Sequence, residues 1–397
     1  MNYTPHSSFS TFIESAYIMK IVLNYLGNYF KKLDKLLLLI CIGITAFDIV
    51  IVQSLFDNGY IKQELVSTQF YAAIIGIVLA VIIGLIDYKW MSKVWYLYAP
   101  AAMILQLLLF SPLGIRRDDD LAWLNLGFTT IQPSEILKLA FILTVSTHIA
   151  KLGDKINSLP HLALLCVHGF APTVLIIIQG DAGSALVFLF MFICMLFAAG
   201  ISWKYIVAAC AAVPAVGYVA WNYIMGDHHR LRIQMLFDEQ LQEQERLGAY
   251  LQQYQGKIAL GSGQLSGLGF ESDSYTYVPE IYNDFIFSYI GMTLGFIGCM
   301  AVVIVMVLIC LKILSDASGA CDMLGKLICT GVFAMITFHC IINIGMVLSV
   351  IPVIGIPLPF ISTGGTSMVM MYASIGLVLS VTTHKEKSKH MFYTEKD

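Results

Sequence analysis

The chain has 397 residues, of which 58% are hydrophobic and 12% are charged. This composition excludes a soluble globular protein and the length excludes a single membrane anchor, so we expect an all-α polytopic membrane protein. The net charge is −3 and the sequence contains no polybasic run, so no nucleic-acid partner is expected.

Residues 1–35 precede the first long apolar stretch and lack the small-residue cleavage pattern of a secretory signal. The stretch from Phe12 to Phe30 is apolar enough for an amphipathic helix on the membrane surface, and simple disorder is the alternative. We expect this N-terminal segment to be cytoplasmic.

Ten apolar stretches follow, each long enough for a helix of about 20 residues that crosses a bilayer. They are residues 36–56, 68–87, 93–111, 133–150, 160–179, 184–200, 203–222, 284–314, 324–350 and 366–383. Residues 36–383 therefore form the predicted membrane domain, and residues 384–397 form a predicted cytoplasmic tail.

Lysine and arginine are divided unevenly between alternating loops. Fifteen of the twenty-three lie on one side, seven lie on the other, and Lys138 lies within a span. Excess positive charge marks the cytoplasmic side, so both termini are predicted to be cytoplasmic. The nine cysteines lie in spans or in a cytoplasmic loop without metal-ligand spacing, so neither a disulfide framework nor a zinc site is expected.

The longest loop, residues 223–283, lies between the seventh and eighth spans and is predicted to be extracytoplasmic. Residues 237–255 are rich in Gln and Glu with helical spacing, whereas residues 261–269 repeat glycine too often for a helix. We therefore expect a helix followed by a flexible loop.

Polar residues gather at the extracytoplasmic ends of several spans, and this convergence is the strongest sign of a functional site. Asp284 stands where the long polar loop meets an apolar run, so its carboxylate can stay hydrated beside a lipid-borne substrate. The polar clusters are Arg116 with Arg117, Gln132-Pro-Ser-Glu135 with Lys138, Gln179 to Gly183, Glu280 with Asp284, and Ile351 to Phe360 with Ser362.

Each cluster also has a purely structural interpretation. Pro133 and Glu135 suit the first turn of a helix, and Asp284 suits a helix N-cap. The prolines and glycines of residues 351–365 suit a tight or re-entrant turn. Lys138 is harder to explain in this way, because an ammonium inside a membrane helix is costly unless it is paired, and Glu135 is its expected partner.

Four further polar residues lie within predicted spans, and we expect each to pair within the core without a role in the site. They are Asp48, His148, His168 and His339.

Three motifs stand in a specific order along the chain: Gln132-Pro-Ser-Glu135 with Lys138, Pro279-Glu280 with Asp284-Phe-Ile-Phe287, and Gly355-Ile-Pro-Leu-Pro-Phe360 with Gly364-Gly365. This ordered set resembles the SEDS family, the RodA, FtsW and SpoVE polymerases of bacterial peptidoglycan. Weaker matches include Arg232, Gln255 and Asn343. The resemblance extends from the first predicted span to the last.

The resemblance implies a glycosyltransferase of the bacterial cytoplasmic membrane. Such an enzyme joins the disaccharide units of lipid II into glycan strands at the outer face and releases undecaprenyl pyrophosphate. Asp284 would be the general base that takes the proton of the attacking sugar hydroxyl. Binding of substrate or pyrophosphate is expected from Lys138, Glu135, Arg232, Arg116, Arg117, Gln255, Glu280 and Ser362.

The resemblance also implies partners and a cofactor. A class B penicillin-binding protein, which is a transpeptidase, is the expected protein partner, beside lipid II, undecaprenyl pyrophosphate and membrane lipids. The family allows for a divalent cation, Mg²⁺ or Mn²⁺, for which the sequence contains no ligand signature.

The chain departs from the family pattern at several positions. Tyr282-Asn283 replaces the usual His-Thr before the catalytic acid, and Thr363 replaces the tyrosine of the commoner Ser-Tyr-Gly. Ala122 stands where a basic residue is frequent. These departures indicate a divergent member of the family.

Two other functions stay open: a lipid II transporter, and a noncatalytic scaffold that activates a penicillin-binding protein. A transporter should carry charged residues along a full path through the membrane. The predicted cytoplasmic halves of the spans are nearly free of charge, which favours chemistry at one face. In a scaffold, Asp284 would be dispensable.

Overall fold

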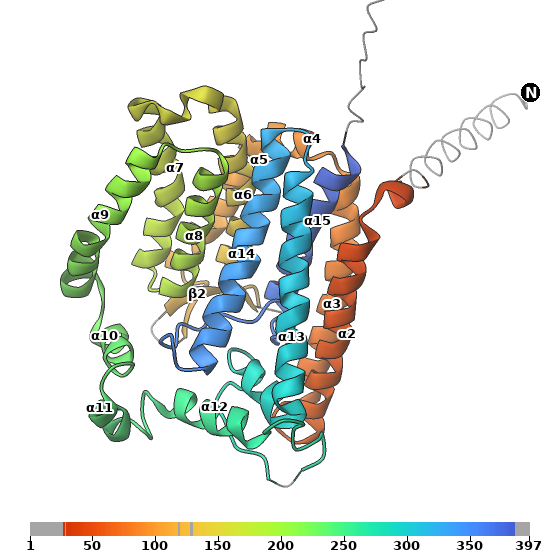
Figure 1. Cartoon of the computed structure of the whole chain (residues 1–397), viewed down its shortest axis with the longest axis vertical. Coiled ribbons are helices and arrows are strands. Elements are labelled where there is room, and N and C mark those ends of the chain that lie inside the picture. The colour runs from red at the N-terminus through yellow and green to blue at the C-terminus, as the bar shows by residue number, and fades with distance from the viewer. Residues whose placement is uncertain (1–26, 28, 118–119, 128–129, 273, 386–397) are drawn as a thin grey trace, which may run out of the picture.

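The computed structural model describes residues 27, 29–117, 120–127, 130–272 and 274–385. In this part of the chain, eight helices are long and apolar enough to cross a membrane, and two further apolar helices, α5 and α8, are shorter. These ten helices correspond, in the same order, to the ten predicted spans (Figure 1). The predicted all-α polytopic fold is therefore confirmed.

Aspartates mark the starts of three of these helices. The carboxylates of Asp34, Asp181 and Asp322 accept backbone N–H groups of α2, α8 and α14 at 3.1, 2.8 and 2.8 Å. Such a cap satisfies an N–H that the helix itself leaves without a partner.

The bounds of the ten helices are α2 (Lys35–Asp57), α3 (Gln63–Leu85), α5 (Trp95–Leu107, continued by η1, Leu108–Phe110), α6 (Pro133–Leu152), α7 (Leu159–Ile178), α8 (Ala182–Ala198), α9 (Trp203–Val219, continued by η3, Ala220–Ile224), α13 (Ile286–Ser318), α14 (Met323–Val347) and α15 (Gly365–Thr383).

The shorter elements lie at the two ends of the bundle (Figure 1). The end called here the far face carries α4 (Tyr88–Lys93) and η2 (Gly153–Asn157). The opposite end, called the loop face, carries residues 348–364 and the elements β1 (Gly114–Arg117), β2 (Asp120–Asn125), β3 (Thr130–Ile131), α10 (Asp227–Gln234), α11 (Glu239–Gln244) and α12 (Leu251–Ser262).

The three strands form an antiparallel sheet in the order β1-β2-β3. The all-helical prediction omitted this sheet, because its short strands show no alternation of apolar and polar residues. The sheet joins α5 to α6 and so leads directly into Gln132-Pro-Ser-Glu135.

α14 packs against α6, α8, α13 and α15. α9 stands at the edge of the bundle (Figure 1). In α14, 72% of the most apolar stretch is buried, against 0% in α9. An apolar helix without buried side chains suits a position surrounded by lipid, while a buried helix can carry polar residues that hold other elements in place. α14 therefore has the position from which a site at the loop face can be organised.

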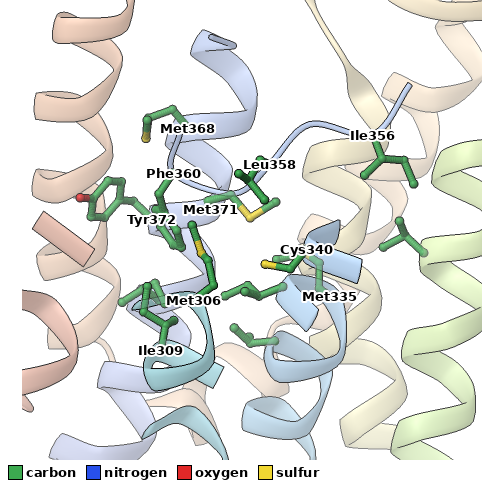
Figure 2. Close-up of a cluster of buried hydrophobic side chains, with 14 of the residues drawn as sticks. Met306, Ile309, Met335, Cys340, Ile356, Leu358, Phe360, Met368, Met371 and Tyr372 are labelled. Atoms are coloured by element: carbon green, nitrogen blue, oxygen red, sulfur yellow. The ribbon is translucent and has the colours of Figure 1, made fainter. Parts of the chain in front are cut away.

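Residues 351–360, called here the proline loop, follow α14 and are packed into the core. Figure 2 shows side chains of α13, α14 and α15 around those of this loop: Met306, Ile309, Met335, Cys340, Met368, Met371 and Tyr372 from the helices, and Ile356, Leu358 and Phe360 from the loop. Because its apolar side chains are buried, the loop has a course fixed by packing.

α13 is interrupted at Gly295, whose φ of 66° and ψ of −162° are not helical. The break frees backbone groups, and in a membrane helix such groups need new partners. Residues 264–269 supply them: Leu268 and Gly269 donate to the carbonyls of Met292 and Thr293 at 2.9 and 3.0 Å, and Phe296 and Ile297 donate to those of Gln264 and Leu265 at 2.9 and 3.2 Å.

The predicted flexible loop at 261–269 is therefore wrong, because most of this segment is fixed against α13. Its glycines permit the close approach: a Cβ on Gly267 would lie 2.1 Å from the carbonyl oxygen of Thr293. The predicted helix over 237–255 is also divided, into α11 and α12, and α12 continues to Ser262. Gly256 lets α12 pack closely against Phe285, since a Cβ at position 256 would lie 2.7 Å from the Phe285 ring.

At the far face, Lys312 of α13 holds the start of α2. Its ammonium donates to Asp34 and, at 2.8 Å, to Asp316. Burial raises the pKa of the Asp34 carboxyl, but the hydrogen bonds from Lys312 and from the Leu37 N–H outweigh burial, so this pKa lies below its ordinary value. Ionised Asp34 therefore stabilises the fold.

The polar residues within spans pair inside the bundle as predicted. Gln69 donates to Asp48 Oδ2 at 2.7 Å, and the Nδ1 atoms of His148 and His168 are 3.1 Å apart. His339 also pairs, but with a residue of the candidate site. Most of the predicted amphipathic N-terminal stretch, residues 12–26 and 28, and most of the C-terminal tail, residues 386–397, lie outside the described residues.

Candidate active site

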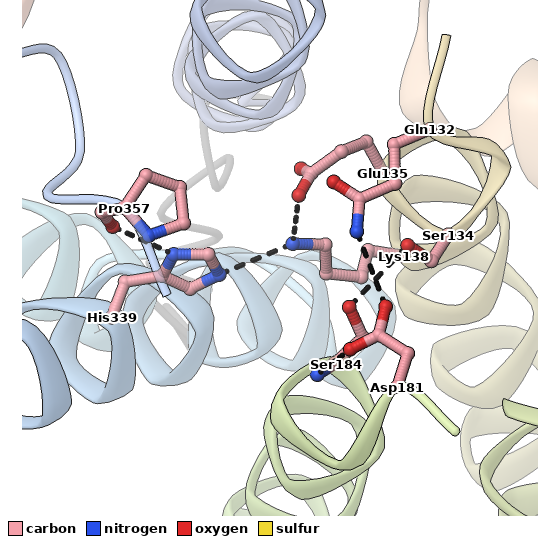
Figure 3. Close-up of polar contacts among 8 residues, drawn as sticks. All are labelled: Gln132, Ser134, Glu135, Lys138, Asp181, Ser184, His339 and Pro357. Atoms are coloured by element: carbon pink, nitrogen blue, oxygen red, sulfur yellow. Dashed lines mark hydrogen bonds and ion pairs between the residues drawn. The ribbon is translucent and has the colours of Figure 1, made fainter. Parts of the chain in front are cut away.

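The first turns of α6 contain a buried ion pair (Figure 3). The Lys138 ammonium lies 2.7 Å from Glu135 Oε1, and the two residues are 1% and 3% exposed. The pairing expected from their spacing is therefore present. Each charge stabilises the other where an isolated charge would be very costly.

His339 of α14 is the second partner of Lys138 (Figure 3). Its Nε2 lies 3.1 Å from the ammonium, and its Nδ1 lies 3.2 Å from the carbonyl oxygen of Pro357. A carbonyl oxygen only accepts, so Nδ1 carries the proton and Nε2 accepts from Lys138. The neutral imidazole thus connects α6 to the proline loop.

These two partners enclose Lys138. Lys138 is only 1% exposed, so a pyrophosphate can reach its ammonium only after neighbouring side chains move. Direct binding of pyrophosphate by Lys138 stays a prediction. Glu135, by contrast, has the contact expected of a residue that holds Lys138 in place.

Asn343, one turn after His339 on α14, holds the segment before α13. Its Nδ2 donates to the carbonyl oxygens of Asp284 and Ile356, both at 2.8 Å. The two N–H groups of this amide are thereby used. Asn343 is 0% exposed, so water does not compete for these bonds. It fixes the backbone of Asp284 against the proline loop.

Asp284 does not cap α13. The N-cap is Phe285, whose side chain makes no capping hydrogen bond. The Asp284 side chain is half-buried, and its Oδ2 lies 3.5 Å from the position that a Cβ on Gly355 would take. The N-cap interpretation is therefore wrong, and the carboxylate faces the proline loop.

Arg232 reaches the same loop from α10. Its Nη1 donates to the carbonyl oxygen of Val353 at 3.0 Å. Because Val353 stands two residues before Gly355, Arg232 and Asp284 approach one short segment, residues 353–355, from different elements. The structure thus brings a predicted cation and the predicted base to one place.

The start of α8 supports this arrangement (Figure 3). Asp181 caps α8 and also accepts a hydrogen bond from Gln132 Nε2 at 3.2 Å, which ties α8 to the start of α6. A Cβ on Gly183 would lie 2.9 Å from the carbonyl oxygen of Ile354. Glycine at this position therefore lets the proline loop pack against α8.

Glu280 and Ser362 make local contacts. Glu280 is exposed, and its carboxylate accepts from the side chain of Asn283 at 2.9 Å. Ser362 is 5% exposed, and its hydroxyl accepts the N–H of Leu358 at 2.7 Å. Their predicted contacts with substrate stay predictions.

Three predicted residues lie further along the loop face. Gln255 is half-buried on α12, while its neighbour Gln253, which sequence reasoning missed, donates to the carbonyls of Met346 and Ile351 at 3.2 and 2.9 Å. Arg116 is exposed on β1. Arg117 follows on the same strand, and its side chain lies outside the described part of the structure.

Among the described residues, no group of three or more His, Cys, Asp or Glu side chains is arranged to hold a metal ion. Glu280 and Asp284 offer two carboxylates at the loop face. This number suits Mg²⁺, which proteins commonly bind through one or two carboxylates together with substrate phosphates. A divalent cation therefore stays a proposal for this site.

Comparison with known proteins identifies the family. A family model described as "Cell cycle protein" (FtsW, RodA, SpoVE) matches residues 31–387. The chain belongs to this family. Similar proteins include peptidoglycan glycosyltransferase MrdB of Escherichia coli strain K12, which is 30% identical over 89% of this chain and 94% of its own. Stage V sporulation protein E of Bacillus subtilis strain 168 is 29% identical over 83% and 89%.

Two solved structures share the fold of this SEDS chain. A chain from a peptidoglycan synthase complex has a TM-score of 0.76 at 23% identity and covers 89% of this chain and 99% of its own. RodA of Thermus thermophilus has a TM-score of 0.68 at 22% identity, with coverages of 89% and 98%.

Two departures from the SEDS pattern lie in contact with each other. The Thr363 hydroxyl lies 2.9 Å from Asn283 Oδ1 and 2.7 Å from the carbonyl oxygen of Tyr282, which also accepts the Thr363 N–H at 3.0 Å. Hydrogen bonds between Thr363 and residues 282–283 thus hold the segment before Asp284 at positions where this chain departs from the family pattern.

Sequence reasoning gave His339 no role in the site. The available signal was its spacing from Asn343, because residues four apart share one helix face. The partners of that face were not available from the sequence, since they follow from the packing of α14 against α6 and the proline loop.

Proposed function

We propose that this chain polymerises lipid II into glycan strands and releases undecaprenyl pyrophosphate. Membership of the FtsW, RodA and SpoVE family supports this function, as do relatives named peptidoglycan glycosyltransferases. The observation that carries the proposal is the placement of Asp284: Asn343 holds its backbone at 2.8 Å, and its half-buried carboxylate faces a loop packed into the membrane bundle.

In the proposed reaction, Asp284 acts as the general base. A sugar hydroxyl is a weak nucleophile, so a positioned carboxylate must take its proton as the oxygen attacks the anomeric carbon of the donor. The new bond joins that oxygen to the anomeric carbon. The bond that breaks joins the same carbon to the pyrophosphate oxygen, which leaves with the electron pair, and inversion results.

Arg232 is the cation that we assign to the leaving pyrophosphate. It contacts the segment that Asp284 also approaches, and an arginine fork matches phosphate oxygens well. A charge preorganised in this way stabilises the transition state most where negative charge develops. A divalent cation at Glu280, if bound, would supply further neutralisation of the pyrophosphate.

The loop face is assigned to the outside of the cell, with both termini in the cytoplasm. The distribution of lysine and arginine supports this orientation of the multi-pass bundle. A class B penicillin-binding protein is the proposed partner. A shared fold with a chain of a complex described as coordinating polymerization and crosslinking supports that choice.

Strand synthesis from purified lipid II tests the proposal. The chain is reconstituted in liposomes with a class B partner, and wild type is compared with Asp284→Asn at equal folded amounts. Asp57→Asn is the matched control, because Asp57 is an exposed acid at the end of α2 on the loop face. We expect strands from wild type and the control but not from Asp284→Asn. Strands from Asp284→Asn at the wild-type rate would exclude Asp284 as the base.

A further inference from the structure

Two side chains of α14 hold two consecutive carbonyl groups of the proline loop. Asn343 Nδ2 donates to the oxygen of Ile356 at 2.8 Å, and His339 Nδ1 donates to that of Pro357 at 3.2 Å. The spacing of four residues places both side chains on one face of a helix. The loop is therefore fixed at two adjacent points by one rigid element.

Each of these side chains also makes a second contact, with a residue outside the loop. Asn343 holds the carbonyl oxygen of Asp284, while His339 Nε2 accepts from Lys138, which Glu135 in turn holds. Hydrogen bonds on the two sides of the Ile356–Pro357 peptide unit thus connect the buried ion pair of α6, through His339, the loop backbone and Asn343, to the backbone of Asp284.

We propose that His339 is a positioning residue for Asp284, and that Lys138 acts on catalysis through His339 instead of touching the pyrophosphate. The inference rests on the proposed function. In it, the ion pair orients the imidazole, the imidazole fixes Pro357, and the fixed loop sets the place of the Asp284 carboxylate.

Burial makes this arrangement sensitive to loss of His339. The residue is 1% exposed and both of its ring nitrogens are engaged, so removing it leaves the Pro357 carbonyl without this donor and Lys138 with Glu135 as its remaining acceptor. The lost donor frees one of the two points at which α14 holds the loop. A general base displaced by a fraction of an ångström keeps its substrate but loses rate.

The experiment measures kcat and KM for lipid II per folded molecule in three variants of α14. His339→Leu removes both hydrogen bonds, and His339→Gln keeps an amide donor and acceptor at the same place. Ile328→Ala is the matched control, since Ile328 is 0% exposed on the same helix but lies about three turns from His339. A thermal denaturation series records how much stability each variant loses.

We expect His339→Leu to lower kcat at least about tenfold with KM changed less than about twofold, and His339→Gln to recover part of the loss. Ile328→Ala should keep its kcat at a comparable loss of stability. His339 and Asn343 act through one loop. Adding Asn343→Leu to the His339→Leu variant should therefore lower kcat by a smaller factor than Asn343→Leu does in the wild-type protein.

Two results separate the inference from the proposed function. If wild type forms strands, Asp284→Asn does not, and His339→Leu keeps the kcat of Ile328→Ala, the positioning role is wrong and the polymerase assignment stands. If wild type forms no strands beside a competent partner, the proposed function itself fails and the role of His339 fails with it.

Discussion

Replacing Lys138 with methionine removes the buried ammonium and keeps a side chain of similar length. The Glu135 carboxylate, 3% exposed, then loses its partner at 2.7 Å, and His339 Nε2 loses its donor. Removing one partner of a buried ion pair costs about 3–5 kcal/mol of folding free energy. We expect the upper end of this range, because the substitution leaves two buried groups without partners.

Glu135→Gln should cost less than Lys138→Met. The glutamine amide oxygen still accepts from the ammonium, and His339 still accepts as well, so the loss is expected at about 3 kcal/mol, the lower end of the range. The double variant Glu135→Leu with Lys138→Met removes both charges. Only His339 Nε2 then lacks a partner, at about 1–3 kcal/mol, so the double variant should be more stable than Lys138→Met alone.

Reversible unfolding in mixed micelles with increasing SDS measures these differences. Lys62→Met is the matched control, because Lys62 is exposed before α3 and its substitution should change the unfolding free energy by less than about 0.5 kcal/mol. Two results would contradict this expectation: a cost of Lys138→Met as small as that of Lys62→Met, or a double variant that is no more stable than Lys138→Met alone.

Three further results are expected. Arg232→Gln should weaken product inhibition by undecaprenyl pyrophosphate about tenfold, whereas Lys138→Met should leave the inhibition constant unchanged, and the reverse order would exchange their roles. Gly267→Ala should destabilise the fold by about 3 kcal/mol or more, because the φ of Gly267 is 83° and an added Cβ would meet the backbone of α13. Gly261→Ala is the control: the space around Gly261 is open, so its stability should change by less than about 1 kcal/mol. Equal melting points for the two variants would contradict this prediction. Asp34→Asn should cost about 2 kcal/mol at pH 7. The folded-state pKa of Asp34 lies below its ordinary value, so this difference should persist above about pH 4 and disappear as the pH falls through the folded-state pKa, and a difference independent of pH would contradict the assignment.

The membrane spans could be predicted because the bilayer sets a minimum length for an apolar helix, and that limit can be read in one dimension. The ion pair of α6 could be predicted for a similar reason, since Glu135 and Lys138 stand one turn apart on the same helix. Both inferences depend on spacing within a single element.

The remaining features depend on contacts between distant elements. The glycines of 261–269 indicated a loop, but their fit into the break of α13 depends on how two segments dock. His339 could be placed on the same helix face as Asn343, yet its contact with Lys138 requires α14 to pack against α6 at one register. Apolar periodicity does not specify that register. The hydrogen bonds that connect Lys138, His339 and the proline loop to Asp284 could therefore be identified only from the structure.

A structure of the Asp284→Asn variant with lipid II bound would test the central claim most directly. We expect the acceptor sugar hydroxyl within about 3 Å of the side chain at position 284 and the donor pyrophosphate beside Arg232. The contacts of His339 and Asn343 with the proline loop should be intact in that complex. Lipid II bound along a path toward the far face, with its pyrophosphate away from residues 353–355, would contradict the proposed polymerase function and favour a transporter.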